Sequence, residues 1–212
     1  MEDKKIRRIN CFGDSYCADP SEGGWIDVLA KKLNAEIGHL GRHGTGPDNC
    51  YKQFSNFLKR SNFDDETGDE DLYIFCWSDA ERVRDVHERQ LPDPYHSVPD
   101  ITITPKYLEA VKLYHTYIHN VAMWENIFFA CHDAVKYKCI TRNLQNVQHF
   151  YCFRREQELV GAEFNLYDLA HREEDYGEEG VDDLEFPNHF SPVGSIKLAE
   201  RIISNLNQGD YS

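Results

Sequence analysis

Short apolar runs alternate with longer amphipathic stretches along this chain. Residues 4–12 change from basic to apolar and predict a first strand, which Gly13 ends. The run 71–77 (DLYIFCW) is continuously apolar, which is typical of a strand buried on both faces of a sheet. Residues 35–41 predict a short strand and residues 146–153 a fourth strand, whereas 163–170 (EFNLYDLA) suits either a strand or a short helix.

Apolar residues at helical spacing lie between these strands. They predict helices over 25–34 (WIDVLAKKLN), 47–60 and about 191–206. The stretch 104–136 opens with a threonine and a proline, an N-cap followed by the residue preferred at the first helical position, and predicts a long helix with room for a break. Residues 91–105 contain four prolines and predict a surface excursion rather than one regular element.

Strands that alternate with helices predict a parallel sheet covered on both faces, a three-layer α/β/α sandwich. The length of 212 residues favours a single domain over 1–212. Ligands of such folds bind at the carboxyl ends of the strands. Ser15, Gly44 and Ser78 follow the first three predicted strands, so we expect them at one edge of the sheet.

Composition narrows the range of partners. The formal net charge of −14 repels phosphate backbones and argues against nucleic-acid binding. No apolar run approaches the ~20 residues that cross a bilayer, and the N-terminus lacks the apolar core of a secretory signal, so we expect no membrane partner and a cytoplasmic location. The seven scattered cysteines predict reduced thiols rather than disulfides or a zinc site.

Two residues suit acyl transfer by a serine nucleophile, which needs a base and hydrogen-bond donors for the oxyanion. Ser15 can be presented by a strand-to-helix turn, and His189 precedes the last helix at the same end of the sheet. The structural alternatives are a simple turn serine and a helix-capping histidine. Cys17 is either a reactive thiol beside this site or a packed side chain. His115 and His119 have the i, i+4 spacing of a metal pair but lack the glutamate of an HExxH motif, so no metal is expected.

Three segments in order resemble the conserved blocks of the SGNH (GDSL-type) hydrolases. They are Gly13-Asp14-Ser15 followed by GGWIDVLAKKL, then HLGRHGTG (39–46), and PNHFSPVGSIKLAERI (187–202). The resemblance implies a flavodoxin-like sheet and ester hydrolysis by a Ser–His–Asp triad without metal or other cofactor. It assigns His189 as the catalytic histidine. It builds the oxyanion hole from the N–H groups of Ser15 and Gly44 and a side chain of the third block.

Two positions depart from the family pattern. Ser78 stands where the family has its oxyanion asparagine, so a shorter hydroxyl would replace an amide donor. Phe186 stands where the family has the aspartate that orients the histidine. Asp183 is the preferred substitute, with Asp182, Glu185 or a backbone carbonyl as alternatives.

The function expected from the sequence is therefore a serine esterase acting on a small-molecule or carbohydrate ester. One alternative is a binding or structural protein of the same fold that has lost activity, which the two departures favour. The other is an acyltransferase that uses the same residues. The sequence identifies neither the acyl group nor the alcohol, and it leaves the oligomeric state open.

Overall fold

The structure is a computed structural model, and it describes most of the strands and helices of the chain. The described residues are 5–18, 20–60, 70–80, 105–118, 120–152, 154–162, 165–166 and 190–208. Within these ranges, no helix has both the length and the apolar character needed to cross a membrane.

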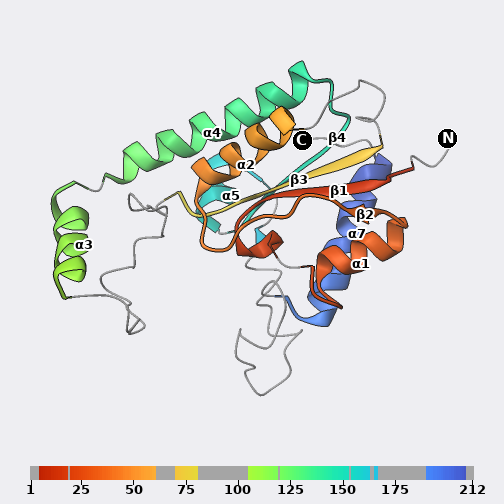
Figure 1. Cartoon of the computed structure of the whole chain (residues 1–212), viewed down its shortest axis with the longest axis horizontal. Coiled ribbons are helices and arrows are strands. Elements are labelled where there is room, and N and C mark those ends of the chain that lie inside the picture. The colour runs from red at the N-terminus through yellow and green to blue at the C-terminus, as the bar shows by residue number, and fades with distance from the viewer. Residues whose placement is uncertain are drawn as a thin grey trace.

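Four parallel strands form one sheet in the order β2-β1-β3-β4 (Figure 1). The strands are β1 (Arg8–Gly13), β2 (Glu36–Ile37), β3 (Asp71–Trp77) and β4 (Asn146–Tyr151). Gly13 pairs with Cys76, and Trp77 pairs with Tyr151, so the carboxyl ends of β1, β3 and β4 lie together. The predicted parallel sheet is confirmed, although β1 begins four residues later than expected and β2 has only two residues.

Helices cover both faces of this sheet (Figure 1). The α-helices of the described residues are α1 (Trp25–Leu33), α2 (Pro47–Arg60), α3 (Pro105–Tyr117), α4 (Val121–Thr141), α5 (Arg154–Val160) and α7 (Pro192–Gln208). On one face α1 packs against α7, and on the other α2 packs against α4. This is the three-layer α/β/α arrangement that the sequence predicts. The short helix α5 was not predicted.

Side chains of β3 alternate between two hydrophobic cores, because successive residues of a strand point to opposite faces. Leu72, Ile74 and Cys76 lie in the core beneath α1 and α7. Tyr73, Phe75 and Trp77 lie in the core beneath α2 and α4. All seven residues of the strand are buried, which explains why its sequence is apolar without alternation.

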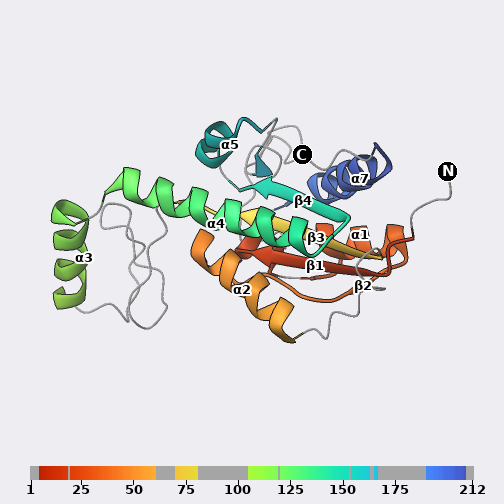
Figure 2. The same ribbon diagram turned by 90° about the horizontal axis from the view of Figure 1, so that it is seen from above.

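The long helix predicted over 104–136 is two helices, and the second continues to Thr141. Asn120 begins the second helix as an N-cap, with its side-chain oxygen accepting a hydrogen bond from the N–H of Met123 at 3.3 Å. The apolar stripe expected along this helix is wrong at the junction, where Ile118 is 64% exposed and Val121 41%. The reason is visible in Figure 2, where α3 and the first turns of α4 project beyond the sheet.

Two histidines lie between the sheet and α4. His149 on β4 accepts a hydrogen bond at Nδ1 from the indole Nε1 of Trp77 at 2.9 Å. His132 on α4 lies 3.0 Å from the hydroxyl of Tyr151 through its Nε2. Burial lowers the pKa of His149 well below its ordinary value of 6.5, and burial also lowers the pKa of His132, to about 4. Both side chains are therefore neutral in the folded protein near pH 7.

Acid is expected to weaken the fold through these two histidines. Between pH 6.5 and 4 the two histidines bind protons in the unfolded chain but not in the folded protein. The free energy of unfolding therefore falls as the pH falls. The shift at His132 alone corresponds to a loss on the order of 3 kcal/mol. Urea unfolding of wild type and His132→Gln at pH 7, 5.5 and 4.5 measures it. The variant should lose less stability on acidification than wild type, and equal slopes for the two proteins would contradict this assignment.

Candidate active site

The turn that follows β1 carries Ser15. Residues Ser15–Cys17 form one turn of 3-10 helix, and Asp14 caps it by accepting a hydrogen bond from the N–H of Tyr16 at 3.0 Å. Asp14, Tyr16 and Cys17 are buried, whereas Ser15 is only partly buried. Ser15 is therefore the residue of this turn that reaches the surface, whereas its chain neighbours are buried.

Gly13 fixes the direction in which this turn leaves the sheet. Its φ is +145°, a conformation that favours glycine, and a Cβ at this position would overlap the carbonyl oxygen of Cys76 on β3. The carbonyl oxygen of Gly13 accepts hydrogen bonds from Arg42 N, Thr45 Oγ1 and Gln53 Nε2, each at 2.9 Å. The N–H of Gly13 donates to Gln53 Oε1 at 3.2 Å. Both backbone groups next to the turn are thus held by other segments.

The glycine-containing loop after β2 packs directly against the turn. Gly41 donates its N–H to the carbonyl of Cys17 at 2.9 Å, and a Cβ on Gly41 would lie 2.5 Å from the Sγ of Cys17. Gly44 follows in the same loop with φ of +64°, in the left-handed region. The structure therefore brings the loop that contains Gly44 next to the turn that contains Ser15, through the contacts of Gly41, Arg42 and Thr45.

Ser78 lies just after β3, the neighbour of β1. It is 1% exposed, and its hydroxyl has no hydrogen-bond partner among the described residues. A buried hydroxyl without a partner costs about 1–3 kcal/mol. The carboxyl ends of β1 and β4 are also linked, because Cys152 Sγ donates to Asp14 Oδ1 at 3.4 Å. An unsatisfied donor thus remains at the edge where three strands end.

Cys17 is a packed thiol and not a reactive one. Burial raises the pKa of Cys17 well above its ordinary value, helped by a hydrogen bond with the thiol of Cys76. Burial likewise raises the pKa of Cys76 to about 12. Both side chains stay protonated at neutral pH, and a thiol is a far weaker nucleophile than a thiolate. All seven cysteines are free, as the sequence predicts.

His189 and Asp183 lie outside the described residues, together with Asp182 and Glu185. Phe190, which follows His189 directly, is described. Its ring is 1% exposed and meets the ring of Tyr16 edge-on, with 5.8 Å between the centroids. The chain next to His189 therefore contacts the residue next to Ser15, although 174 positions separate Tyr16 from Phe190 in the sequence.

Metal binding finds no support within the described ranges, where no group of three or more His, Cys, Asp or Glu side chains is placed to hold an ion. His119 and the side chain of His115 fall outside those ranges, so the pair considered from the sequence is not covered.

Gln53 is a positioning residue that sequence reasoning missed. It holds both backbone groups of Gly13 from α2, and its own amide nitrogen donates to Asn49 Oδ1 at 2.7 Å. Asn49 and Gln53 are both buried. A signal was present, because two amides spaced i, i+4 lie on the helix face that also carries Cys50 and Phe54.

Comparison with protein-family models found no match, and comparison with curated protein sequences found none either. Among solved structures, the chain is similar to a member of the lipolytic protein G-D-S-L family from Veillonella parvula. The two share 15% sequence identity with a TM-score of 0.39, over 94% of this chain and 99% of the other. Because the identity and the TM-score are this low, the function has to be argued from the site itself.

Proposed function

We propose that this chain is a serine-dependent ester hydrolase in which Ser15 is the nucleophile and His189 the base. The observation that carries the proposal is the contact between Tyr16 and Phe190. It joins the two chain neighbours of the proposed pair. The partial exposure of Ser15, in a turn whose other residues are buried, adds support because a nucleophile must reach its substrate.

The proposed reaction has two halves. Ser15 Oγ attacks the ester carbonyl carbon while His189 takes its proton, and the tetrahedral intermediate collapses as His189 returns the proton to the leaving alcohol. Water then attacks the acyl-enzyme, again with His189 as base, and releases the acid and free Ser15. Asp183 is the acid that we propose to orient His189, with Asp182, Glu185 or a backbone carbonyl as the other acceptors within reach along the chain. No cofactor takes part in these steps.

The oxyanion would be stabilised by three donors from three segments. We assign the N–H of Ser15, the N–H of Gly44 and the hydroxyl of Ser78. What supports Ser78 is its buried hydroxyl, which lacks a partner in the described part of the chain. A substrate oxygen that gains negative charge would accept a hydrogen bond from this hydroxyl. That hydrogen bond would reach its full strength only in the transition state.

Covalent labelling tests the nucleophile directly. A fluorophosphonate probe should label the folded protein, and the adduct should lie on the tryptic peptide 9–31, which contains both Ser15 and Ser21. Fragmentation of this peptide by mass spectrometry should place the adduct on Ser15. Label on Ser21 or on another peptide, or no label together with no turnover of short-chain nitrophenyl esters, would contradict the proposal.

Ser78→Ala is expected to lower kcat about 10- to 100-fold and to leave KM nearly unchanged. The reason is that a donor aimed at the oxyanion acts in the transition state and little in the ground state. Ser78→Asn should retain activity, since the amide supplies a donor on a longer side chain. Steady-state kinetics on a nitrophenyl ester measures both variants, with urea unfolding to show that they are folded. Equal kcat for wild type and Ser78→Ala would remove Ser78 from the oxyanion hole.

A further inference from the structure

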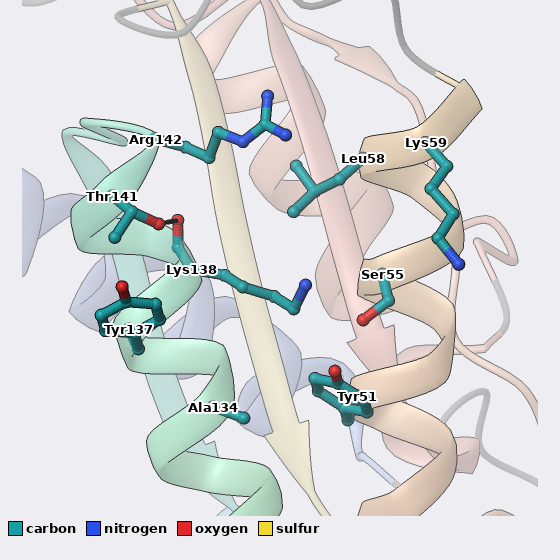
Figure 3. A pocket seen from close by; sticks show the side chains of 9 residues that line it. All are labelled: Tyr51, Ser55, Leu58, Lys59, Ala134, Tyr137, Lys138, Thr141 and Arg142. Atoms are coloured by element: carbon teal, nitrogen blue, oxygen red, sulfur yellow. Dashed lines mark hydrogen bonds between the residues drawn. The ribbon is translucent and has the colours of Figure 1, made fainter.

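A groove lies between α2 and α4, and none of its nine lining residues belongs to the candidate active site (Figure 3). Its volume is about 460 Å³, within the range of small-molecule sites. It is lined on the α2 side by residues from Tyr51 to Lys59, and on the α4 side by residues from Ala134 to Thr141 and by Arg142, which follows the helix. The Ser15 turn is held by a different face of α2, where buried Gln53 bonds both backbone groups of Gly13. The groove and the candidate active site are therefore separate.

Charge in the groove is opposite to that of the protein as a whole. Three of its nine lining residues are cations, Lys59, Lys138 and Arg142, and none is acidic, in a chain of net charge −14. None of the three forms an ion pair with another residue in the described ranges. Lys138 extends from α4 toward α2, and its ammonium lies 5.6 Å from the centre of the Tyr51 ring. Lys138 and Arg142 thus offer two charges that no carboxylate of the described chain neutralises.

Helix dipoles explain only part of this arrangement. Each helix carries roughly half a negative charge at its C-terminus, which favours cations there. Two helix ends therefore offset about one of the three positive charges. The dipoles also give no account of Ser55, whose hydroxyl is buried in the wall of the groove without a hydrogen-bond partner among the described residues. In Figure 3 this hydroxyl points into the groove on the side that faces Lys138.

We propose that this groove binds a small phosphorylated molecule, with the phosphate held by Arg142, Lys138 and the Ser55 hydroxyl. A phosphomonoester carries about 1.5 to 2 negative charges near pH 7, which matches the two cations that point into the groove. The guanidinium of Arg142 suits two phosphate oxygens at once. The apolar side chains of Leu58 and Ala134 line the remaining space and accept an apolar ligand body. A nucleic acid does not fit, because its many phosphates would be repelled by the rest of this acidic surface.

Calorimetry with two probes, inorganic phosphate and phenyl phosphate, tests the site on the full chain at low ionic strength. We expect phenyl phosphate to bind with a Kd of roughly 0.1–1 mM, and phosphate more weakly because it lacks the apolar body. Phenol, which carries no phosphate, should not bind. Arg142→Gln should weaken phenyl phosphate at least about 10-fold, and Ser55→Ala several-fold. Lys32→Gln is the matched control, because this lysine is paired with Glu200 away from the groove, and it should bind as wild type does.

Three results would overturn the proposal. One is no binding of either probe by wild type. Another is binding that Arg142→Gln and Lys32→Gln weaken equally, which would indicate diffuse attraction to surface cations. The third concerns the acidic residues Asp64, Asp65 and Glu66, which lie outside the described residues. If wild type binds nothing and the triple variant D64N/D65N/E66Q gains binding, the occupant of the groove is this segment of the chain itself. Binding measured by calorimetry does not depend on ester hydrolysis. The groove proposal can therefore fail while the proposed role of Ser15 holds, and the reverse is also true.

Discussion

Ser15→Ala should abolish ester hydrolysis, with kcat lowered by at least about 10³-fold. Without the nucleophile no acyl-enzyme can form. Water would then attack the ester directly, accelerated only by the oxyanion donors. KM should change little, because the hydroxyl contributes little to ground-state binding. Since Ser15 is only partly buried, the free energy of unfolding should stay within about 1 kcal/mol of wild type. Kinetics on nitrophenyl acetate and butyrate, and fluorophosphonate labelling, measure the loss.

The exposed serine of α7, Ser204, provides the control, and Ser204→Ala should keep full activity. Turnover by Ser15→Ala at the rate of wild type would refute the esterase proposal. Two other outcomes separate the alternatives raised by the sequence. An inactive, unlabelled wild type that is folded would favour a binding protein of this fold. Product formed only when an acceptor alcohol is added would favour acyl transfer with the same residues.

Gly13→Ala is expected to cause the largest loss of stability, on the order of 3–5 kcal/mol. The added methyl group would overlap the carbonyl oxygen of Cys76, so β1 and β3 would have to separate where they pair. The φ of +145° adds strain for any residue with a Cβ. A domain of this kind is stable by about 5–15 kcal/mol in total, so the variant would be close to unfolded. Urea unfolding followed by circular dichroism measures the change.

Gly23→Ala is the matched control for this prediction. Gly23 also has a positive φ, +82°, but a Cβ there would have no atom within 4 Å. It should cost only about 1 kcal/mol, which is the conformational strain without the overlap. If Gly13→Ala and Gly23→Ala were equally destabilising, the close approach of Gly13 to Cys76 would not hold in the protein.

The sheet was predictable because its central strand is apolar on both faces. The run 71–77 has the length and the apolar character of a strand buried on both faces, and helices of good periodicity flank it. The break between the end of α3 at Tyr117 and the start of α4 at Val121 was harder to place, since the apolar spacing continues through it. It is made by one local hydrogen bond of Asn120 and by a helix that extends past the sheet, so that Ile118 and Val121 have too little to pack against. Periodicity reports what a helix offers for packing, but not whether a partner is present.

The part of the candidate site that was predictable is the placement of its loops, because this follows from the order and direction of the strands. Ser15, the loop of Gly44, and Ser78 follow parallel strands, and strand ends meet at one edge. The sequence shows the amides of Asn49 and Gln53 on one helix face, but it does not show that Gln53 bonds to Gly13, because that depends on how α2 lies across the sheet. The roles of His189 and Asp183 stay predictions that rest on the sequence and on the position of Phe190.

The link between Asp14 and Cys152 also has a consequence for how the protein is made. Asp14 leaves the ribosome early, whereas Cys152, whose thiol bonds to its carboxylate, is 138 residues further along. Gln53, which holds Gly13, follows it by 40 residues. A nascent chain therefore lacks the bond between Asp14 and Cys152 until residue 152 has been made. The hydrogen bonds of Gly13 and Cys17 with residues 41–53 need only the first quarter of the chain, whereas the bond of Asp14 to the residue that follows β4 needs most of it.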